Sequence, residues 1–153
     1  MNYVRELRTL VGHRPLIIPS AAVLILNDEN CLLMQHRQDN QLWGLIGGSM
    51  EIGESLEETA KREVREETNL ELDELNWFNL FSGKELIYTY PHGDVIANVV
   101  AVYISRKFRG ILKVNKLEGD ELRFFETDKL PEDISPPDQP IVESFLAYTK
   151  NFQ

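Results

Sequence analysis

Apolar residues along this chain come in short runs, separated by charged or turn-forming segments. The runs at residues 16–26 and 95–108 are rich in branched aliphatic side chains, which is typical of buried strands. Residues 3–11 and 138–148 instead place apolar residues on one face at helical spacing. Further strands are expected at residues 31–36, 72–81, 86–90 and 122–125. Because the helices are few and widely separated, the pattern predicts an α/β fold in which helices flank a mixed sheet.

The first two strands are expected to form a hairpin. Residues 27–30 read Asn-Asp-Glu-Asn, a turn sequence between the apolar runs 16–26 and 31–36. We therefore predict that residues 31–36 are the antiparallel partner of residues 16–26.

The segment between Ser55 and Asn69 predicts a helix with an unusual inner face. Ser55 and Glu58 form a Ser-x-x-Glu capping box at its start, and Asn69 suits the left-handed conformation in which helices end. On a helical wheel of about 100° per residue, Glu63 and Glu67 fall within the arc of the apolar residues. Uncompensated buried charge is costly. The interpretation that all charges of this helix face solvent therefore does not explain Glu63 and Glu67.

Carboxylates packed closely on this helix indicate a cation site. Glu66 lies at the edge of the apolar arc, so three carboxylates come close together. Each raises the cost of ionising its neighbours unless a cation lies between them. Hard divalent cations such as Mg²⁺ bind oxygen ligands of this kind and usually share them with substrate phosphates.

Residues 48–70 resemble the Nudix box, G-x5-E-x7-R-E-U-x-E-E-x-G-U, where U is a bulky aliphatic residue. The matching residues are Gly48, Glu54, Arg62, Glu63, Val64, Glu66, Glu67 and Leu70. Asn69 stands in place of the second glycine of the family, and asparagine is the best substitute for that left-handed geometry. The resemblance extends from about Ile17 to the C-terminal helix. It implies the Nudix α/β/α sandwich with a mixed sheet, as a single domain over residues 1–153.

The resemblance also implies a metal centre. Glu63, Glu66 and Glu67 would hold Mg²⁺, with Mn²⁺ as an alternative, and the backbone carbonyl of Gly48 would be a further ligand. The general base varies among relatives between a box residue and a loop residue.

Other charged residues have assisting roles in this interpretation. Glu54 would help to order the site, and Arg62 would pair with neighbouring glutamates. Many relatives take one more acidic ligand or base from a loop before the last strand. Glu121 or Glu118 could serve here, although a solvated acidic turn explains each equally well.

Substrate contacts are less well specified. Arg37 closes the second strand and could reach a substrate phosphate, or could simply be an exposed arginine. Trp43 could stack on a base, with a core or rim position as the alternative. The same two alternatives apply to Tyr88 and Tyr90, whereas His13 and His92 are expected to be surface histidines, with substrate contact as the alternative.

Composition narrows the class of protein. A chain of 153 residues can bury a sizeable core, and its single cysteine, Cys31, lies in an apolar run and is expected to be buried. With no signal sequence and no stretch of membrane-spanning length, we expect a cytoplasmic protein without a membrane partner. A net charge of −9 disfavours a nucleic-acid groove, which should be basic. If the chain forms a homodimer, the N-terminal segment and the hairpin around Tyr88 are the expected contacts.

The resemblance implies a pyrophosphohydrolase that cleaves a nucleoside diphosphate linked to another moiety. Substrate candidates are nucleotide sugars including ADP-ribose, oxidised nucleoside triphosphates and dinucleoside polyphosphates. One alternative is a nucleotide-sensing Nudix module without catalysis, which would be expected to have lost box glutamates. Another is an interaction domain that presents the acidic helix to a basic partner, but the inward positions of Glu63 and Glu67 disfavour it.

Overall fold

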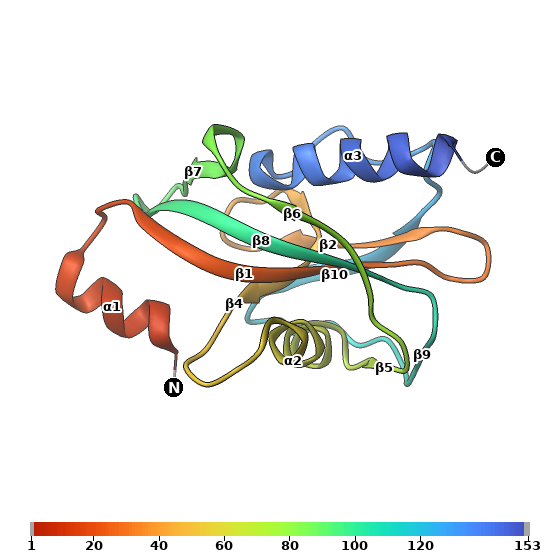
Figure 1. Cartoon of the computed structure of the whole chain (residues 1–153), viewed down its shortest axis with the longest axis horizontal. Helices are drawn as coiled ribbons and strands as arrows, with labels where there is room; N and C mark the ends of the chain where they lie inside the picture. Colours follow the sequence, from red (N-terminus) through yellow and green to blue (C-terminus); the bar gives the residue numbers. More distant parts are fainter. Residues whose placement is uncertain (1, 152–153) are drawn as a thin grey trace.

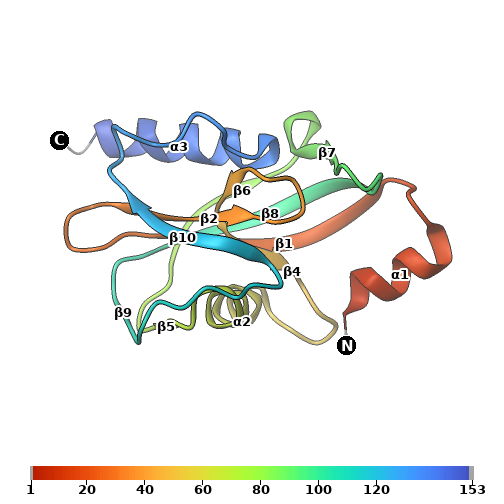
Figure 2. The same cartoon turned by 180° about the vertical axis from the view of Figure 1, so that it is seen from behind.

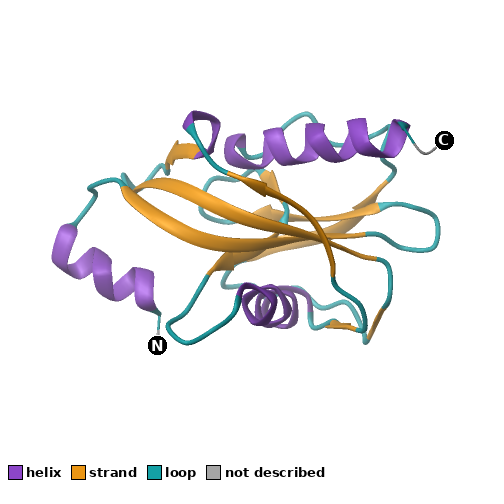
Figure 3. Cartoon of the chain, viewed as in Figure 1, coloured by secondary structure: helices purple, strands orange, loops and turns teal. Residues whose placement is uncertain are grey.

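The computed structural model of the chain describes residues 2–151 and has three layers. Helix α2 (Leu56–Thr68) lies on one side of the strands and helix α3 (Gln139–Lys150) on the other (Figures 1 and 3). Helix α1 (Tyr3–Val11) stands at one end, where the backbone N–H of Tyr3 donates to the carboxylate of Glu51 at 2.9 Å. The predicted α/β/α sandwich with a mixed sheet is therefore confirmed.

The larger sheet carries the long central strands. Strand β8 (Val95–Ser105) runs parallel to β1 (Leu16–Ile25), and β4 (Ile46–Ser49) is antiparallel to β1 on its other edge. Strands β6 (Asn76–Phe81) and β7 (Ile87–Thr89) both pair with the remaining edge of β8, antiparallel to it.

Two smaller sheets complete the strand layer. Strand β2 (Leu32–Arg37) lies between β10 (Gly119–Phe125) and β3 (Trp43–Gly44), all antiparallel. Strands β5 (Glu71–Leu72) and β9 (Phe108–Arg109) form a two-stranded ribbon near the end of α2 (Figure 2).

The prediction that residues 16–26 and 31–36 form a hairpin is wrong. A single bridge, Leu26 with Leu32, joins the two segments. Strand β1 already has β4 on one edge and β8 on the other, so no edge is left for β2. The turn between the segments was visible locally, whereas the partners of β1 come from distant parts of the chain.

Two other predicted strands are interrupted. Residues 95–108 form β8 only as far as Ser105, whose hydroxyl donates to the carbonyl of Glu74 at 2.8 Å before the chain turns into β9. Residues 72–81 are divided between β5 and β6. Short 3₁₀ helices at Lys84–Leu86 and Pro136–Asp138 precede β7 and α3.

Two apolar cores lie on the two faces of the sheets. Ala22 and Leu24 of β1 pack on the α3 side with Phe145, whereas Ala21 and Val23 pack on the α2 side. Because both faces of β1 and β8 are covered along most of their length, these strands are almost continuously apolar instead of alternating.

Cys31 is a buried free cysteine, as predicted. Within residues 2–151, no helix is both long and apolar enough to cross a membrane.

Candidate active site

Helix α2 begins and ends as its sequence predicts. The Ser55 side chain caps the helix by accepting a hydrogen bond from the backbone N–H of Glu58 at 3.1 Å. Asn69 ends it in the left-handed conformation, with φ of 67°, and its backbone N–H donates to the carbonyl of Arg65. The glycine missing from the box is thus replaced without loss of the helix end.

The inner face of α2 carries the two glutamates that the helical wheel placed there. Glu63 is 9% exposed and Glu67 is 2% exposed, among the buried Thr59, Ala60 and Val64. The Glu66 side chain is 50% exposed, in agreement with its position at the edge of the arc.

Two consecutive glycines let β4 approach these glutamates. A Cβ atom on Gly48 would lie 2.4 Å from the carboxyl carbon of Glu63. One on Gly47 would lie 2.3 Å from the carbonyl oxygen of Ala21. The missing side chain of Gly48 therefore brings the β4 backbone against the Glu63 carboxylate, and that of Gly47 brings it against β1. The backbone N–H of Gly47 also donates to Glu67 Oε2 at 3.3 Å.

Arg62 joins the remaining carboxylates of the box. Its guanidinium contacts Glu54 Oε2 at 2.6 Å, Glu63 Oε1 at 2.9 Å and Glu66 Oε2 at 3.1 Å. It also donates to the carbonyl of Ser49 at 3.0 Å, which fixes α2 against β4. The hydrogen bonds from Arg62 lower the pKa of Glu54 to about 2. Glu54 and Arg62 thus form a brace, as their predicted assisting roles require.

Glu67 lacks such a partner. Its one hydrogen bond to the part of the chain that the structure describes is the long one from Gly47. Burial raises its pKa well above the ordinary value, and the neighbouring Glu63 and Glu118 add to the rise. Burial also raises the pKa of Glu63, although Arg62 opposes that shift. A buried carboxylate with two carboxylate neighbours is stabilised by added positive charge.

The donor set fits a hard divalent cation. Glu63 and Glu67 offer carboxylate oxygens beside the β4 backbone, which is the oxygen-rich environment that Mg²⁺ prefers. Among residues 2–151, no three His, Cys, Asp or Glu side chains are already arranged as a complete metal site. Arg62 donates hydrogen bonds to an oxygen of Glu63 and to one of Glu66.

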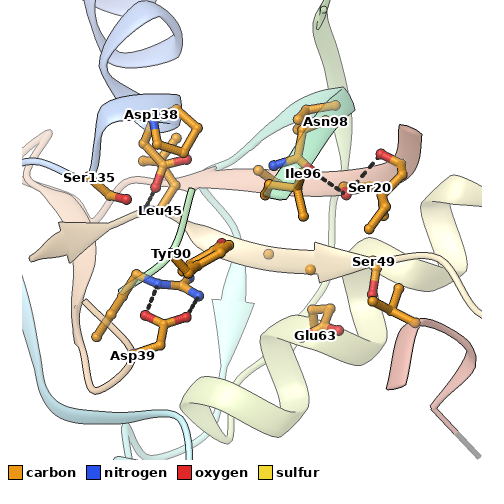
Figure 4. A pocket seen from close by; sticks show the side chains of 18 of the residues that line it. Ser20, Asp39, Leu45, Ser49, Glu63, Tyr90, Ile96, Asn98, Ser135 and Asp138 are labelled. Carbon is orange, nitrogen blue, oxygen red and sulfur yellow. Dashed lines mark hydrogen bonds and ion pairs between the residues drawn. The ribbon is translucent and has the colours of Figure 1, made fainter. Parts of the chain in front are cut away.

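A pocket of about 290 Å³ opens from these glutamates. Side chains from β1 and β8 form its floor, and residues of α1 and of the segment before α3 also line it. Figure 4 shows Ser20, Ile96 and Asn98 on the floor and Ser135 and Asp138 before α3. The polar lining away from the box includes Ser20, Asn98, Arg37, Asp39, Tyr90 and Asp138. Glu118 also lines the pocket together with Glu63 and Glu67.

The end of the pocket near α3 has its own charge balance. Arg37 makes a two-pronged ion pair with Asp39, with nitrogen–oxygen distances of 2.9 and 2.6 Å (Figure 4). Asp138 Oδ2 accepts from the backbone N–H of Leu45 at 3.1 Å. Burial raises the pKa of Asp138 to about 6, with Arg37 opposing, and raises the pKa of Tyr90 to about 12. Arg37 is thus neutralised within the protein and is less available to a phosphate than its sequence position suggested.

Two residues expected at the site lie elsewhere. Trp43 is 8% exposed in the core, packed edge-on against Phe125 and His36, so the structure gives no support to a stacking role. Glu121 is paired with Arg123 and is not among the pocket-lining residues. Strand geometry explains the second case, because β10 carries Glu121 away while the preceding Glu118 stays at the pocket.

Sequence reasoning missed Ser20, Asn98, Asp39 and Asp138. Asp39 and Asp138 both lie outside any recognisable motif; Asp39 is a local partner of Arg37, two residues away, whereas the fold brings the distant Asp138 near Arg37. Ser20 and Asn98 carried a weak signal, since each is a polar residue inside an otherwise apolar strand.

Comparison with known proteins agrees with this geometry. The family model described as NUDIX domain matches residues 17–145. A protein named NAD-capped RNA hydrolase NudC from Vibrio atlanticus (strain LGP32) is 30% identical over 132 residues, which are 86% of this chain and 44% of that protein. The protein of the same name from Vibrio vulnificus (strain CMCP6) is 31% identical over 127 residues, 82% of this chain and 44% of its own. The chain therefore spans less than half the length of these relatives.

Solved structures share the fold. A MutT NUDIX hydrolase from Burkholderia pseudomallei superposes with a TM-score of 0.71 at 22% identity, covering 84% of this chain and 98% of its own. A MutT protein from Methanosarcina mazei Go1 gives a TM-score of 0.70 at 20% identity, covering 90% and 96%. At such identities the likeness concerns the fold alone.

Proposed function

Because this chain belongs to the NUDIX domain family, we propose that it is a Mg²⁺-dependent pyrophosphohydrolase that cleaves a nucleoside diphosphate linked to another moiety. One observation carries the proposal. Glu67 is buried at the edge of the pocket with one long hydrogen bond and with Glu63 and Glu118 as neighbours. Such a group is costly to keep ionised unless a cation binds beside it.

The residues that would hold Mg²⁺, or Mn²⁺ in its place, are Glu63, Glu67 and Glu66, with the backbone carbonyl of Gly48. When bound, the metal neutralises charge on substrate phosphates and lowers the pKa of a bound water. The brace of Arg62 and Glu54 keeps α2 against β4, so that the carboxylates stay at the pocket edge. This arrangement supplies the positioning on which phosphoryl chemistry depends.

Glu118 is our choice for the general base. It lines the same pocket and is close enough to raise the pKa of both Glu63 and Glu67. Its carboxylate would take the proton from the attacking water. Glu121 was the other candidate, but its ion pair with Arg123 leaves it outside the pocket.

The pocket and the relatives together support the proposed substrate class. A cavity of about 290 Å³ suits a small diphosphate compound. The relatives are named for NAD-capped RNA, so NAD joins ADP-ribose and nucleoside triphosphates as a compound to test. The net charge of −9 favours the small compound over an RNA. We further propose that residues 1–153 form one domain of a cytoplasmic protein, and a sedimentation or light-scattering measurement would decide between monomer and homodimer.

A substrate screen in oxygen-18 water tests the proposal. The purified chain is incubated with NAD, ADP-ribose, nucleoside triphosphates and dinucleoside polyphosphates, with Mg²⁺, with Mn²⁺ and with a chelator. We expect metal-dependent cleavage and heavy oxygen in a phosphate of the products, because water attacks phosphorus. Label on a sugar hydroxyl, or activity unchanged by the chelator, would contradict the mechanism.

A nucleotide-sensing module without catalysis is the second candidate. All box glutamates are retained, which favours the enzyme. Tight binding of a compound from the same screen, without turnover at saturating metal, would favour the sensor.

A further inference from the structure

The floor of the pocket contains one polar contact between two apolar strands. Ser20 is the only side chain of β1 that can hydrogen-bond, and Asn98 is the only polar residue between Val95 and Val102 of β8. The two side chains lie diagonally across the parallel strands, because Asn98 is in register with Ile18. Both face the pocket (Figure 4).

The contact leaves half of the amide unused. Ser20 Oγ lies 3.2 Å from Asn98 Oδ1 and donates to it, with the carbonyl of Ile18 as a second acceptor at 3.4 Å. The amide nitrogen lies on the far side from Ser20 (Figure 4), and no group within residues 2–151 accepts a hydrogen bond from it. Asn98 is half-buried and lines the pocket, so its amide nitrogen is open to a ligand that enters there.

The surroundings of Asn98 define what its amide nitrogen can bind. Ile18, Ile96 and Val100 form the apolar floor around it. Arg8, an arginine of the lining, donates to the carbonyls of Val95 and Arg14, both at 2.6 Å, and pairs with Asp94 at 3.5 Å. No free cation therefore stands beside the amide in the described part of the pocket.

We propose that Asn98, oriented by Ser20, binds a neutral acceptor oxygen of the substrate, a hydroxyl or carbonyl of its nucleoside portion. This inference rests on the proposed function. A neutral donor on an apolar floor suits an uncharged oxygen, whereas the phosphates belong at the glutamates, where the metal would be. Asn98 is therefore a substrate-binding residue and Ser20 a positioning residue, and neither takes part in the bond cleavage.

Kinetics of Asn98→Ala, Asn98→Asp and Ser20→Ala test the assignment on the compound that the screen identifies. We expect Asn98→Ala to raise KM by about three- to tenfold with kcat nearly unchanged, the effect of one neutral hydrogen bond. Asn98→Asp should raise KM at least as much, because the carboxylate has no donor. Ser20→Ala should also raise KM, but by a smaller factor than Asn98→Ala. Asn79→Ala, an exposed asparagine on β6, is the matched control and should leave KM unchanged.

A binding measurement separates this inference from the hydrolase proposal. The rise in melting temperature is recorded in the presence of Mg²⁺ with one ligand at a time. The ligands are the four nucleoside monophosphates AMP, GMP, CMP and UMP, and inorganic pyrophosphate. We expect at least one monophosphate to stabilise the wild type, and Asn98→Ala to lose that shift while keeping the one from pyrophosphate. If the variant keeps the shift caused by pyrophosphate, this also shows that the variant is folded.

Several results would overturn the assignment. If Asn98→Ala lost both shifts equally, the acceptor would be a phosphate. If Asn98→Asp behaved like wild type, the amide oxygen and not the nitrogen would face the ligand. Unchanged KM and binding in Asn98→Ala, or no monophosphate shift even in the wild type, would leave the pair a purely structural contact. Monophosphate binding through Asn98 without any hydrolysis would support this inference while refuting the hydrolase proposal.

Discussion

The two ends of the pocket both hold carboxylates, yet they differ in how the charge is balanced. At the α3 end, Arg37 pairs with Asp39 at 2.6 Å and its charge opposes the rise in the pKa of the nearby Asp138, so the protein supplies its own cation there. At the α2 end, Arg62 forms an ion pair with Glu54 but is not among the residues that line the pocket. Glu67 is left with one backbone hydrogen bond within the described residues. The first end is complete without a ligand, whereas the second needs a cation from solution. The unbalanced negative charge at the α2 end therefore indicates that the metal and the phosphates should bind there.

Glu67→Gln should give the largest effect. A neutral amide is a poorer ligand for a hard cation, so we expect kcat to fall by about 10²–10⁴ at saturating Mg²⁺ while the fold persists. Removing a buried carboxylate should leave the melting temperature equal or higher. Glu58→Gln, on the solvent side of the same helix, is the control and should retain full activity. More than half of wild-type activity in Glu67→Gln would refute the contrast between the two ends.

Gly48→Ala should reduce activity next most strongly. The added methyl group would lie 2.4 Å from the Glu63 carboxyl carbon, so that side chain must move, and we expect kcat to fall by about 10–100-fold. Gly47→Ala meets backbone instead, at Ala21, and should mainly lower stability, by about 1–3 kcal/mol. Kinetics and chemical denaturation on both variants would check the distinction. Equal effects of the two on kcat and on stability would show that the glycines serve only the turn.

Divalent cations should stabilise the α2 end specifically. Binding to the folded state at about 100 times the dissociation constant adds about 2.7 kcal/mol, which corresponds to a rise of several degrees in melting temperature. Thermal melts in millimolar Mg²⁺ and in NaCl of the same ionic strength make the comparison. Identical curves in the two salts, or the same Mg²⁺ response in Glu67→Gln, would contradict a metal site there.

Asp138→Asn should have a smaller, pH-dependent effect at the α3 end. Burial raises the pKa of Asp138 to about 6 against Arg37, so the folded state binds a proton more readily than the unfolded chain. The stability that this proton contributes is present at about pH 4 and is lost as pH rises through 6. Relative to wild type, Asp138→Asn should therefore gain on the order of 1–2 kcal/mol in free energy of unfolding between pH 4 and pH 7.

Denaturation at several pH values measures this difference, with the exposed Asp133→Asn as the control. A constant difference between Asp138→Asn and wild type across that range would show that Asp138 keeps an ordinary pKa, and would contradict the burial of its carboxyl at the α3 end described above.

The sequence by itself determined the local features of this protein. The ends of α2 at Ser55 and Asn69, the inward direction of Glu63 and Glu67, and the buried strands all follow from short-range patterns and helix periodicity. The box spacing further pointed to a metal-dependent hydrolase, because its residues lie on one turn and one helix.

Tertiary structure decided everything that depends on distant segments meeting. It gave both edges of β1 to β4 and β8, so the predicted hairpin could not form. It placed Trp43 in the core, brought Glu118 and not Glu121 to the pocket, and joined Ser20 to Asn98 across 78 residues. The physical reason is that local propensity specifies which residues form helices and strands, whereas strand pairing and core packing select their neighbours from the whole chain.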